Sequence, residues 1–115
     1  MNASDAITPE QVVTALIRAM DANDADRIRS LFAEHATQKY ERWYAFKKSG
    51  DKFRAWLESD IIAVHGQVKN PNIKADGNEV VVTGTYSNND GYSSPANFLL
   101  LVENRKIVSW TMRYD

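Results

Sequence analysis

The first strong pattern along the chain is a stripe of apolar residues at the three- and four-residue spacing of a helix. The stripe is formed by Val12, Val13, Leu16, Ile17 and Met20. Just before it, Thr8 can cap a helix, Pro9 suits the first helical position, and Gln11 stands three residues after the cap, as in a capping box. The pattern therefore predicts an amphipathic helix that ends near the turn-rich segment 21–24.

Two more helices are predicted in the first half of the chain. One covers residues 25–33, and its inward positions are Ile28, Leu31 and Phe32. His35 follows this helix and is interpreted as a surface residue near its C-terminal dipole. The other helix follows Gly50, with Asp51 as its cap, and one of its faces carries Phe53, Trp56 and Leu57. Between the two helices, a short strand is predicted over 37–42.

The rest of the chain predicts strands joined by short connections. The predicted strands cover residues 61–68, 73–75, 79–86, 96–103 and 106–114. Pro71 is expected to end the first of them, 76–78 and 104–105 are turns, and the polar loop 87–95 is placed over a pocket mouth. Helices followed by hairpin-connected strands indicate one α+β domain over residues 1–115, with antiparallel strands because the connections are too short for crossovers.

The amino-acid composition limits the kinds of catalysis and of metal or cofactor binding that the chain can support. The chain has 115 residues, of which 43% are hydrophobic and 25% charged, as in ordinary soluble domains. No cysteine is present, which excludes thiol catalysis, disulfides and cysteine-based zinc sites. The two histidines are distant in sequence and no phosphate-binding or dinucleotide motif occurs, so we expect neither a metal nor a cofactor.

The net charge and the hydropathy pattern limit which binding partners and which cellular location are expected. The formal net charge is −1, which argues against nucleic acid, and the local excess of lysine and arginine over residues 39–54 is interpreted as solvated surface. No apolar stretch approaches the ~18 to 20 residues of a membrane helix, so no membrane partner is expected. The start of the chain lacks the basic region and apolar run of a signal peptide, which favours a cytoplasmic location.

Several short segments follow one another in an order that carries a family resemblance. They are 22–26, 31–37, Val64-His65-Gly66, Asn70-Pro71, Asp76-Gly77-Asn78 and 106–110. With the order of elements, they make the chain similar to the nuclear transport factor 2-like superfamily, which includes the SnoaL-like and ketosteroid isomerase families. The resemblance implies a cystatin-like α+β barrel, in which a cone-shaped, curved, mostly antiparallel sheet wraps around the N-terminal helices. It also implies a pocket at the wide end and homodimers through the outer sheet face.

The resemblance does not extend to the ketosteroid isomerase catalytic groups. Where those enzymes place a general-base Asp, this chain has Tyr40, and their oxyanion-binding Tyr falls at Leu16. Their protonated acid falls at Asn97, an amide that can donate a hydrogen bond but cannot titrate. Ketosteroid isomerase chemistry is therefore not expected.

The same alignment suggests which side chains point into the cone. If Asn97 points inward, the period of two along a strand also turns Leu99 and Leu101 inward. On the neighbouring strands, the predicted inward residues are Val80, Val82, Gly84, Tyr86, Val108, Trp110, Met112 and Tyr114. The residues predicted to contact a ligand are Leu16, Tyr40, Trp56, Val82, Tyr86, Leu99, Trp110, Met112 and Tyr114.

Few residues offer acid–base chemistry. His65 is the strongest candidate for a base, because it lies on a predicted strand in apolar surroundings and its neutral imidazole can exchange a proton. A structural or outward-facing histidine is the alternative. Asn97 is the candidate hydrogen-bond donor, and Asp60 is interpreted as a cap or a carboxylate at the pocket rim.

Two functions are compatible with the sequence. The first is a homodimeric domain that binds a small apolar molecule and, without a cofactor, catalyses its isomerisation, dehydration or hydrolytic ring opening. The second is a non-catalytic interaction module whose outer sheet face binds a second copy or another protein. That face is predicted to carry Thr83, Thr85, Ser109 and Thr111.

Overall fold

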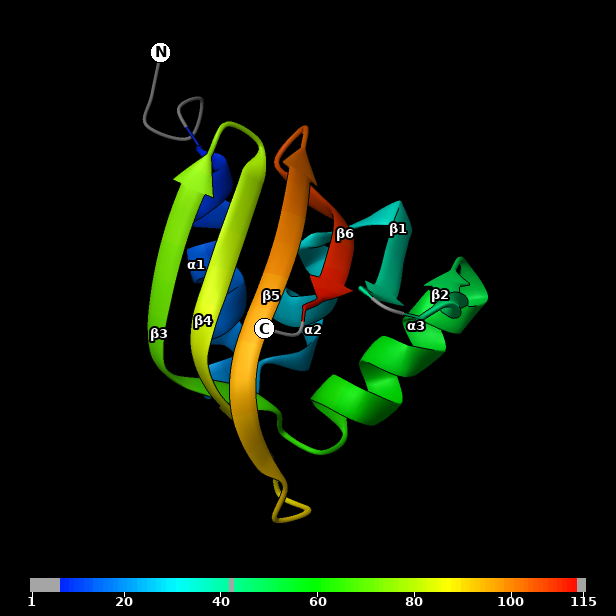
Figure 1. Ribbon diagram of the computed structural model, residues 1–115, viewed down its shortest axis with the longest axis vertical. Helices are drawn as coiled ribbons and strands as arrows, with labels where there is room; N and C mark the ends of the chain where they lie inside the picture. Colours follow the sequence, from blue (N-terminus) through cyan, green and yellow to red (C-terminus); the bar gives the residue numbers. More distant parts are fainter. Residues whose placement is uncertain (1–6, 42, 114–115) are drawn as a thin grey trace.

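A computed structural model describes residues 7–41 and 43–113, which form a six-stranded sheet with helices on one face (Figure 1). In chain order the elements are α1 (Pro9–Asp21), α2 (Ala25–Ser30), β1 (Phe32–Tyr40), β2 (Trp43–Ser49), α3 (Asp51–Trp56), the π-helical turn η2 (Leu57–Ile62), β3 (Gln67–Asp76), β4 (Glu79–Ser87), β5 (Ser93–Glu103) and β6 (Lys106–Met112). The predicted α+β class is confirmed. Among the described residues, no helix is long and apolar enough to cross a membrane.

The sheet is curved and open, with the strand order β2-β1-β6-β5-β4-β3. Every neighbouring pair is antiparallel except β1 and β6, which are parallel. The prediction of antiparallel pairing is therefore wrong for this one pair. It rested on the short connections between successive strands, whereas β1 and β6 are separated by most of the chain and need no short connection.

Helix α1 forms as the sequence predicts. The Thr8 hydroxyl accepts a hydrogen bond from the Gln11 N–H at 3.2 Å, and the Gln11 side chain accepts one from the Thr8 N–H at 2.9 Å. This capping box satisfies two amides that the first turn leaves without helical partners. The five residues of the apolar stripe are all buried, and α1 packs against the inner faces of β3, β4 and β5, behind the sheet in Figure 1.

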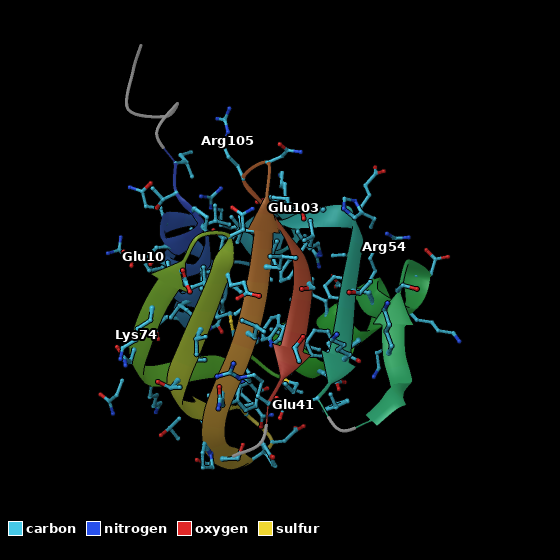
Figure 2. All side chains as sticks on the ribbon, turned by 45° about the horizontal axis from the view of Figure 1, so that its top comes forward. Glu10, Glu41, Arg54, Lys74, Glu103 and Arg105 are labelled. Atoms are coloured by element: carbon cyan, nitrogen blue, oxygen red, sulfur yellow. The ribbon has the colours of Figure 1, made fainter. Side chains whose placement is uncertain are left out.

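The core lies between α1 and the sheet. Its most completely buried apolar side chains, each at most 1% exposed, include Val13, Leu16, Met20, Val80, Val82, Leu100, Ile107 and Trp110. Charged side chains such as Glu10, Lys74, Arg54 and Arg105 project away from this core into solvent (Figure 2). Burial of the α1 stripe against the strands therefore supplies the main driving force for this half of the fold.

The second helix is shorter than predicted. It ends at Ser30, and the backbone then joins the sheet, where the Ile107 N–H donates a hydrogen bond to the Leu31 carbonyl oxygen at 2.8 Å. Phe32, predicted as helical, begins β1, and His35 lies within that strand instead of after a helix. Pairing with β6 outweighs the weak local preference for helix in this segment.

The segment between β1 and η2 also differs from prediction. A strand was expected only over 37–42, but β2 adds a second strand and forms a hairpin with β1. Gly50, with a φ of +56°, is the cap residue of α3. Asp51 is instead the first helical residue, and its carboxylate pairs with Arg54.

The predicted strand over 61–68 is wrong for most of its length. Helical backbone continues to Ile62, and the Gly66 N–H donates a hydrogen bond to the Ile61 carbonyl oxygen at 2.8 Å in the turn that follows. Strand β3 begins only at Gln67. The β-branched run favours a strand locally, but Ile61 is buried in the core from the helical conformation.

Strand β3 runs through Pro71, which was expected to end it. The register with β4 shifts between Lys69 and Asn72, so a bulge accommodates the proline, which has no N–H to donate. The strand also lies at the edge of the sheet, where proline is tolerated. The predicted strand over 73–75 is therefore the second half of β3.

The faces of β5 are opposite to prediction. Its buried side chains are Ala96, Phe98, Leu100 and Val102. Phe98 pairs with Val82 on one side and with Met112 on the other, so this set faces the helices. The predicted inward orientation is therefore wrong for Asn97, Leu99 and Leu101. Both alternating sets of this strand contain large apolar residues, so their pattern does not identify the buried face.

The predicted inward residues of β4 are confirmed, as are Trp110 and Met112 on β6. Val80 and Val82 are fully buried, Gly84 pairs with Ala96, and Tyr86 pairs with Ser94. On β6, Trp110 and Met112 pair with the inward Leu100 and Phe98, but at the register shift Ile107 instead of Val108 pairs with the inward Val102. Tyr114 lies outside the described residues. The outward set is Thr83, Thr85, Ser109 and Thr111, as predicted.

Candidate functional site

A cavity of about 1150 Å³ opens at the end of the sheet that α1 does not cover. In Figure 1 it lies toward the lower end of the view, where α3 leads into η2 beside β5 and the β4–β5 hairpin extends beyond the other strands. Its walls include Tyr40, Trp56, Asp60, Tyr86, Phe98 and Met112. The cavity is thus enclosed by a short helical segment on one side and by the inner sheet face on the other.

The apolar wall of the cavity is built from aromatic rings. Trp56 and Phe98 both border the cavity, and each lies with its ring centroid 5.2 Å from that of Trp110 in the core behind them. Tyr86 and Tyr92 form a second pair at the hairpin, with their centroids 6.0 Å apart. Such edge-to-face and tilted arrangements fix the rings and give the cavity a defined shape.

Tyr86 is the most strongly positioned polar group in the cavity. Its hydroxyl donates a hydrogen bond to the Asp60 carbonyl oxygen at 3.0 Å and accepts one from the Asn88 side-chain amide at 3.3 Å. Partial burial raises the pKa of the Tyr86 hydroxyl above its ordinary value of 10.0. The hydroxyl is therefore protonated at neutral pH and held between η2 and the hairpin.

Gly66 makes room for this tyrosine. A Cβ atom at Gly66 would lie 2.8 Å from the Tyr86 hydroxyl oxygen and 2.9 Å from a ring carbon. Any larger residue would therefore push the ring out of its position. The close approach explains why the turn between η2 and β3 carries a glycine at this point.

The cavity also has acidic groups. Asp60 and Asp90 both border it, and the Asp60 carboxylate accepts a hydrogen bond from the Ser59 hydroxyl at 2.8 Å. The sequence suggested a carboxylate at the rim for Asp60 but gave no role to Ser59, Asn88, Asp90 or Tyr92. Polar residues in a loop carry no periodic signal, so only the folded hairpin reveals that they meet η2.

Comparison with known proteins identifies the family. The model of the SnoaL-like domain matches residues 13–110. The chain belongs to the SnoaL-like domain family. No sequence among curated proteins matches it.

Solved structures share the fold of this SnoaL-like domain at low sequence identity. A nuclear transport factor 2-like protein of unknown function from Cytophaga hutchinsonii is 17% identical, with a TM-score of 0.78 over 95% of this chain and 91% of that one. A proposed polyketide cyclase from Pseudomonas putida is 18% identical, with a TM-score of 0.74 over 95% and 92%. A proposed ketosteroid isomerase from Kribbella flavida is 12% identical, with a TM-score of 0.75 over 93% and 77%. These similarities establish the fold alone.

His65 of this SnoaL-like domain does not lie on a strand, contrary to prediction. It occupies an exposed turn with a φ of +53° and is not among the residues that border the cavity. Its ring Nδ1 lies 2.9 Å from the Asn89 side-chain nitrogen, and the Asn89 N–H donates a hydrogen bond to the Val64 carbonyl oxygen at 2.8 Å. His65 thus links the turn after η2 to the loop of the β4–β5 hairpin, and a catalytic role for it is still a prediction.

Asn97 is positioned by Arg113, the residue that follows β6. Its side-chain oxygen accepts a hydrogen bond from the Arg113 Nε at 3.1 Å, and its carbonyl oxygen accepts one from the Arg113 N–H at 2.8 Å. Both residues border the cavity, but the Asn97 side chain belongs to the set that faces away from the helices. Its predicted role as a donor to a ligand is also untested.

The cavity brings together four of the predicted ligand contacts. Those that border it are Tyr40, Trp56, Tyr86 and Met112. Leu16, Val82 and Trp110 are instead buried in the core, and Leu99 faces outward. Within the described residues, no group of three or more histidine, cysteine, aspartate or glutamate side chains could hold a metal ion.

Proposed function

We propose that this SnoaL-like domain binds a small, largely apolar molecule in the cavity between η2 and the β4–β5 hairpin. The observation that carries this proposal is the cavity itself, with a volume of about 1150 Å³ and aromatic walls. Ligand pockets are typically apolar cavities of several hundred to about 1,000 Å³ with a few polar groups that orient the ligand. Tyr86, Asn88 and Asp60 supply such groups here.

Proton transfer is the reaction class that these polar groups support. The Asp60 carboxylate can accept a proton from a bound molecule, and the Tyr86 hydroxyl keeps its own proton at neutral pH because burial raises its pKa. Isomerisation, dehydration and hydrolytic ring opening can all use such a pair. In this proposal Asp60 is the base and Tyr86 the donor, whose hydroxyl exchanges the Asp60 carbonyl oxygen for a ligand atom as its acceptor when the ligand binds. His65 acts only through the position of the hairpin loop.

A cavity-filling variant with a matched control tests the binding proposal. Ser94 borders the cavity beside Tyr86, its pairing partner on β4, whereas the adjacent Ser93 is exposed. Ser94→Trp should reduce the affinity for an aromatic probe such as 2-ethylnaphthalene by at least about tenfold, and Ser93→Trp should leave it unchanged. Calorimetric titration of the two folded variants measures both effects, and equal affinities would rule out the cavity as the binding site.

We propose a second function because the outer sheet face carries partly exposed apolar residues. Val81 and Leu99 pair across β4 and β5 on this face, and in Figure 1 α1 and α2 lie behind the sheet and leave β4 and β5 uncovered on this side. This face is the proposed homodimer interface. Leu99→Lys should convert dimers to monomers in sedimentation velocity experiments, while the exposed control Lys74→Glu should not. A wild-type protein that sediments as a monomer would refute the interface.

A further inference from the structure

Two buried N–H groups on the inner sheet face have no hydrogen-bond partner within the described part of the chain. They are the side-chain Nε2 of Gln38 and the indole Nε1 of Trp110. Gln38 is 0% exposed and Trp110 is 1% exposed. Buried polar groups in folded proteins nearly always have partners, and an unpaired buried donor lowers stability. Two such donors on paired residues therefore call for an acceptor.

The two donors come from neighbouring strands and lie next to the cavity. Gln38 on β1 pairs with Trp110 on β6, and the next pair on the same face is Tyr40 with Met112. Tyr40 and Met112 border the cavity. Because two residues along a strand span about 7 Å, the donors lie just one residue pair deeper in the sheet than the cavity wall.

The orientation of the Gln38 amide is fixed by a lysine. Its side-chain oxygen accepts a hydrogen bond from Lys48 Nζ at 3.3 Å. An ammonium group has no lone pair to offer, so the amide cannot be turned to place its nitrogen against Lys48. The Nε2 group is therefore directed away from Lys48.

The aromatic rings that pack against Trp110 in the described part of the chain supply no side-chain acceptor. Its ring packs against Phe32, Trp56 and Phe98, and their side chains offer hydrocarbon or an indole N–H that only donates. Two of these rings, Trp56 and Phe98, border the cavity. An acceptor atom that reaches Trp110 from the cavity would therefore pass between apolar walls.

We propose that Gln38 Nε2 and Trp110 Nε1 bind the carbonyl oxygen of the ligand, which makes an apolar ketone or related neutral carbonyl compound the substrate class. This inference rests on the proposed ligand-binding function. A neutral oxygen fits because both donors are uncharged and an anion would lose its hydration among aromatic rings. The half-buried Met112, whose side chain is flexible, is the group that moves aside to admit the oxygen.

A matched pair of probes tests the proposal on the wild-type protein. 2-Acetylnaphthalene and 2-ethylnaphthalene have nearly the same shape, but only the first has a carbonyl oxygen. The indole N–H resonance of Trp110, assigned by its loss in Trp110→Phe, should move downfield on addition of the ketone and not of the hydrocarbon. Movement of equal size with both probes, or with neither although both bind, would overturn the proposal.

Two variants distinguish the contribution of the Gln38 N–H group from that of the neighbouring Lys48. Gln38→Met removes the N–H group at nearly constant length, and it should reduce the affinity for the ketone by about five- to tenfold without weakening binding of the hydrocarbon. Lys48→Met, the control, removes the partner of the amide oxygen and should keep the preference for the ketone. Equal losses for both probes in Gln38→Met would contradict a donor role. If Gln38→Met does not fold, Trp110→Phe provides the same comparison.

The outcomes also separate this inference from the function on which it rests. If neither probe binds, the ligand-binding function fails and the carbonyl site fails with it. If both bind equally and a long-lived water shows a nuclear Overhauser contact to the Trp110 N–H, the cavity binds ligands but a water satisfies the donors. That result would overturn only the carbonyl site.

Discussion

The two ends of the inner sheet face differ in what covers them. At the end under α1, Val80, Val82 and Leu100 are at most 1% exposed. At the other end, Tyr86, Ala96 and Met112 continue the inward sets of the same strands but border a cavity of about 1150 Å³. The strands are thus similar at both ends, whereas the packing is complete at one end and open at the other.

The covering helices account for this difference. Helix α1 has 13 residues and a full apolar stripe, so it fills the curve of the sheet. The π-helical turn η2 has only six residues, and three of them in succession are the polar Glu58, Ser59 and Asp60. Because η2 is short and polar, its side chains do not fill the space between it and the sheet. The cavity is therefore due to this polar cover, η2, more than to the strands.

The largest expected effect is the loss of a side chain at the closed end. Leu16→Ala should lower the free energy of unfolding by about 2–5 kcal/mol, because Leu16 is 1% exposed and its removal leaves a void. Met112→Ala at the open end should cost about 1 kcal/mol or less, since the half-buried side chain already borders open space. Urea unfolding of both variants measures the contrast, and equal losses would contradict it.

Gly84 stands between the two ends, opposite the bulge of β3. Its φ is +150°, and a Cβ atom there would lie 2.7 Å from the Lys69 carbonyl oxygen at the β3 bulge. Gly84→Ala should therefore lower the free energy of unfolding by about 2–3 kcal/mol through strain and overpacking. Gly91→Ala is the control: its φ of +82° is also unfavourable for alanine, but open space surrounds it, so about 1 kcal/mol is expected. Similar unfolding midpoints for the two variants would exclude the steric explanation.

The closed end was largely predictable from the sequence. The α1 stripe repeats at helical spacing after a capping box, and the strands that it covers are bounded by turns such as Asp76-Gly77-Asn78. Local pattern and tertiary packing agree there. On β5 they do not agree. Both alternating sets of side chains contain large apolar residues, and only the pairing of Phe98 with Val82 identifies the inner set.

The open end could not be predicted in the same way. The run from Ile61 to Val64 has the composition of a strand, but it forms the end of η2 and a turn. Because this run was predicted to be a strand, His65 was placed on a strand, whereas it lies on an exposed turn. The contacts of Tyr86 with Asp60 join segments 26 residues apart, and no periodicity along the chain encodes them.

A smaller effect is expected from filling the space beside Tyr86. Gly66→Ala should displace the ring from its hydrogen bond to the Asp60 carbonyl oxygen and cost about 1 kcal/mol. In the wild type, burial raises the pKa of Tyr86, so its contribution to stability is present below pH 10.0 and is lost as the pH rises through the folded-state pKa. In Gly66→Ala that pKa should fall toward its ordinary value. Phenolate absorbance, with Tyr86→Phe subtracted, measures it, and an unchanged titration would show that the ring has not moved.

The smallest expected effect concerns the ion pair that joins α2 to η2. Arg29 on α2 donates to the Glu58 carboxylate on η2 at 2.6 and 2.8 Å, and this contact holds the pKa of Glu58 below its ordinary value. The pair therefore stabilises the fold above pH 4.5, and the contribution is lost as the pH falls through the lower folded-state pKa. Glu58→Gln should lower the urea midpoint slightly at pH 7, and the difference from the wild type should shrink as the pH falls below 4.5 and the wild-type carboxylate takes up its proton.

High salt provides a second test of the Arg29–Glu58 ion pair. Both side chains of the pair are about half exposed, so about 1 M salt should screen their attraction and bring the wild type close to Glu58→Gln at pH 7. Asp26→Asn is the control, because Asp26 also contacts Arg29 but is 97% exposed and belongs to α2 itself. It should change the midpoint less than Glu58→Gln does. If the two variants behave alike, the charge of Arg29 matters only within α2, and the polar cover over the cavity is held by other contacts, among them the buried Leu57 and Ile61 and the Tyr86 hydrogen bond to Asp60.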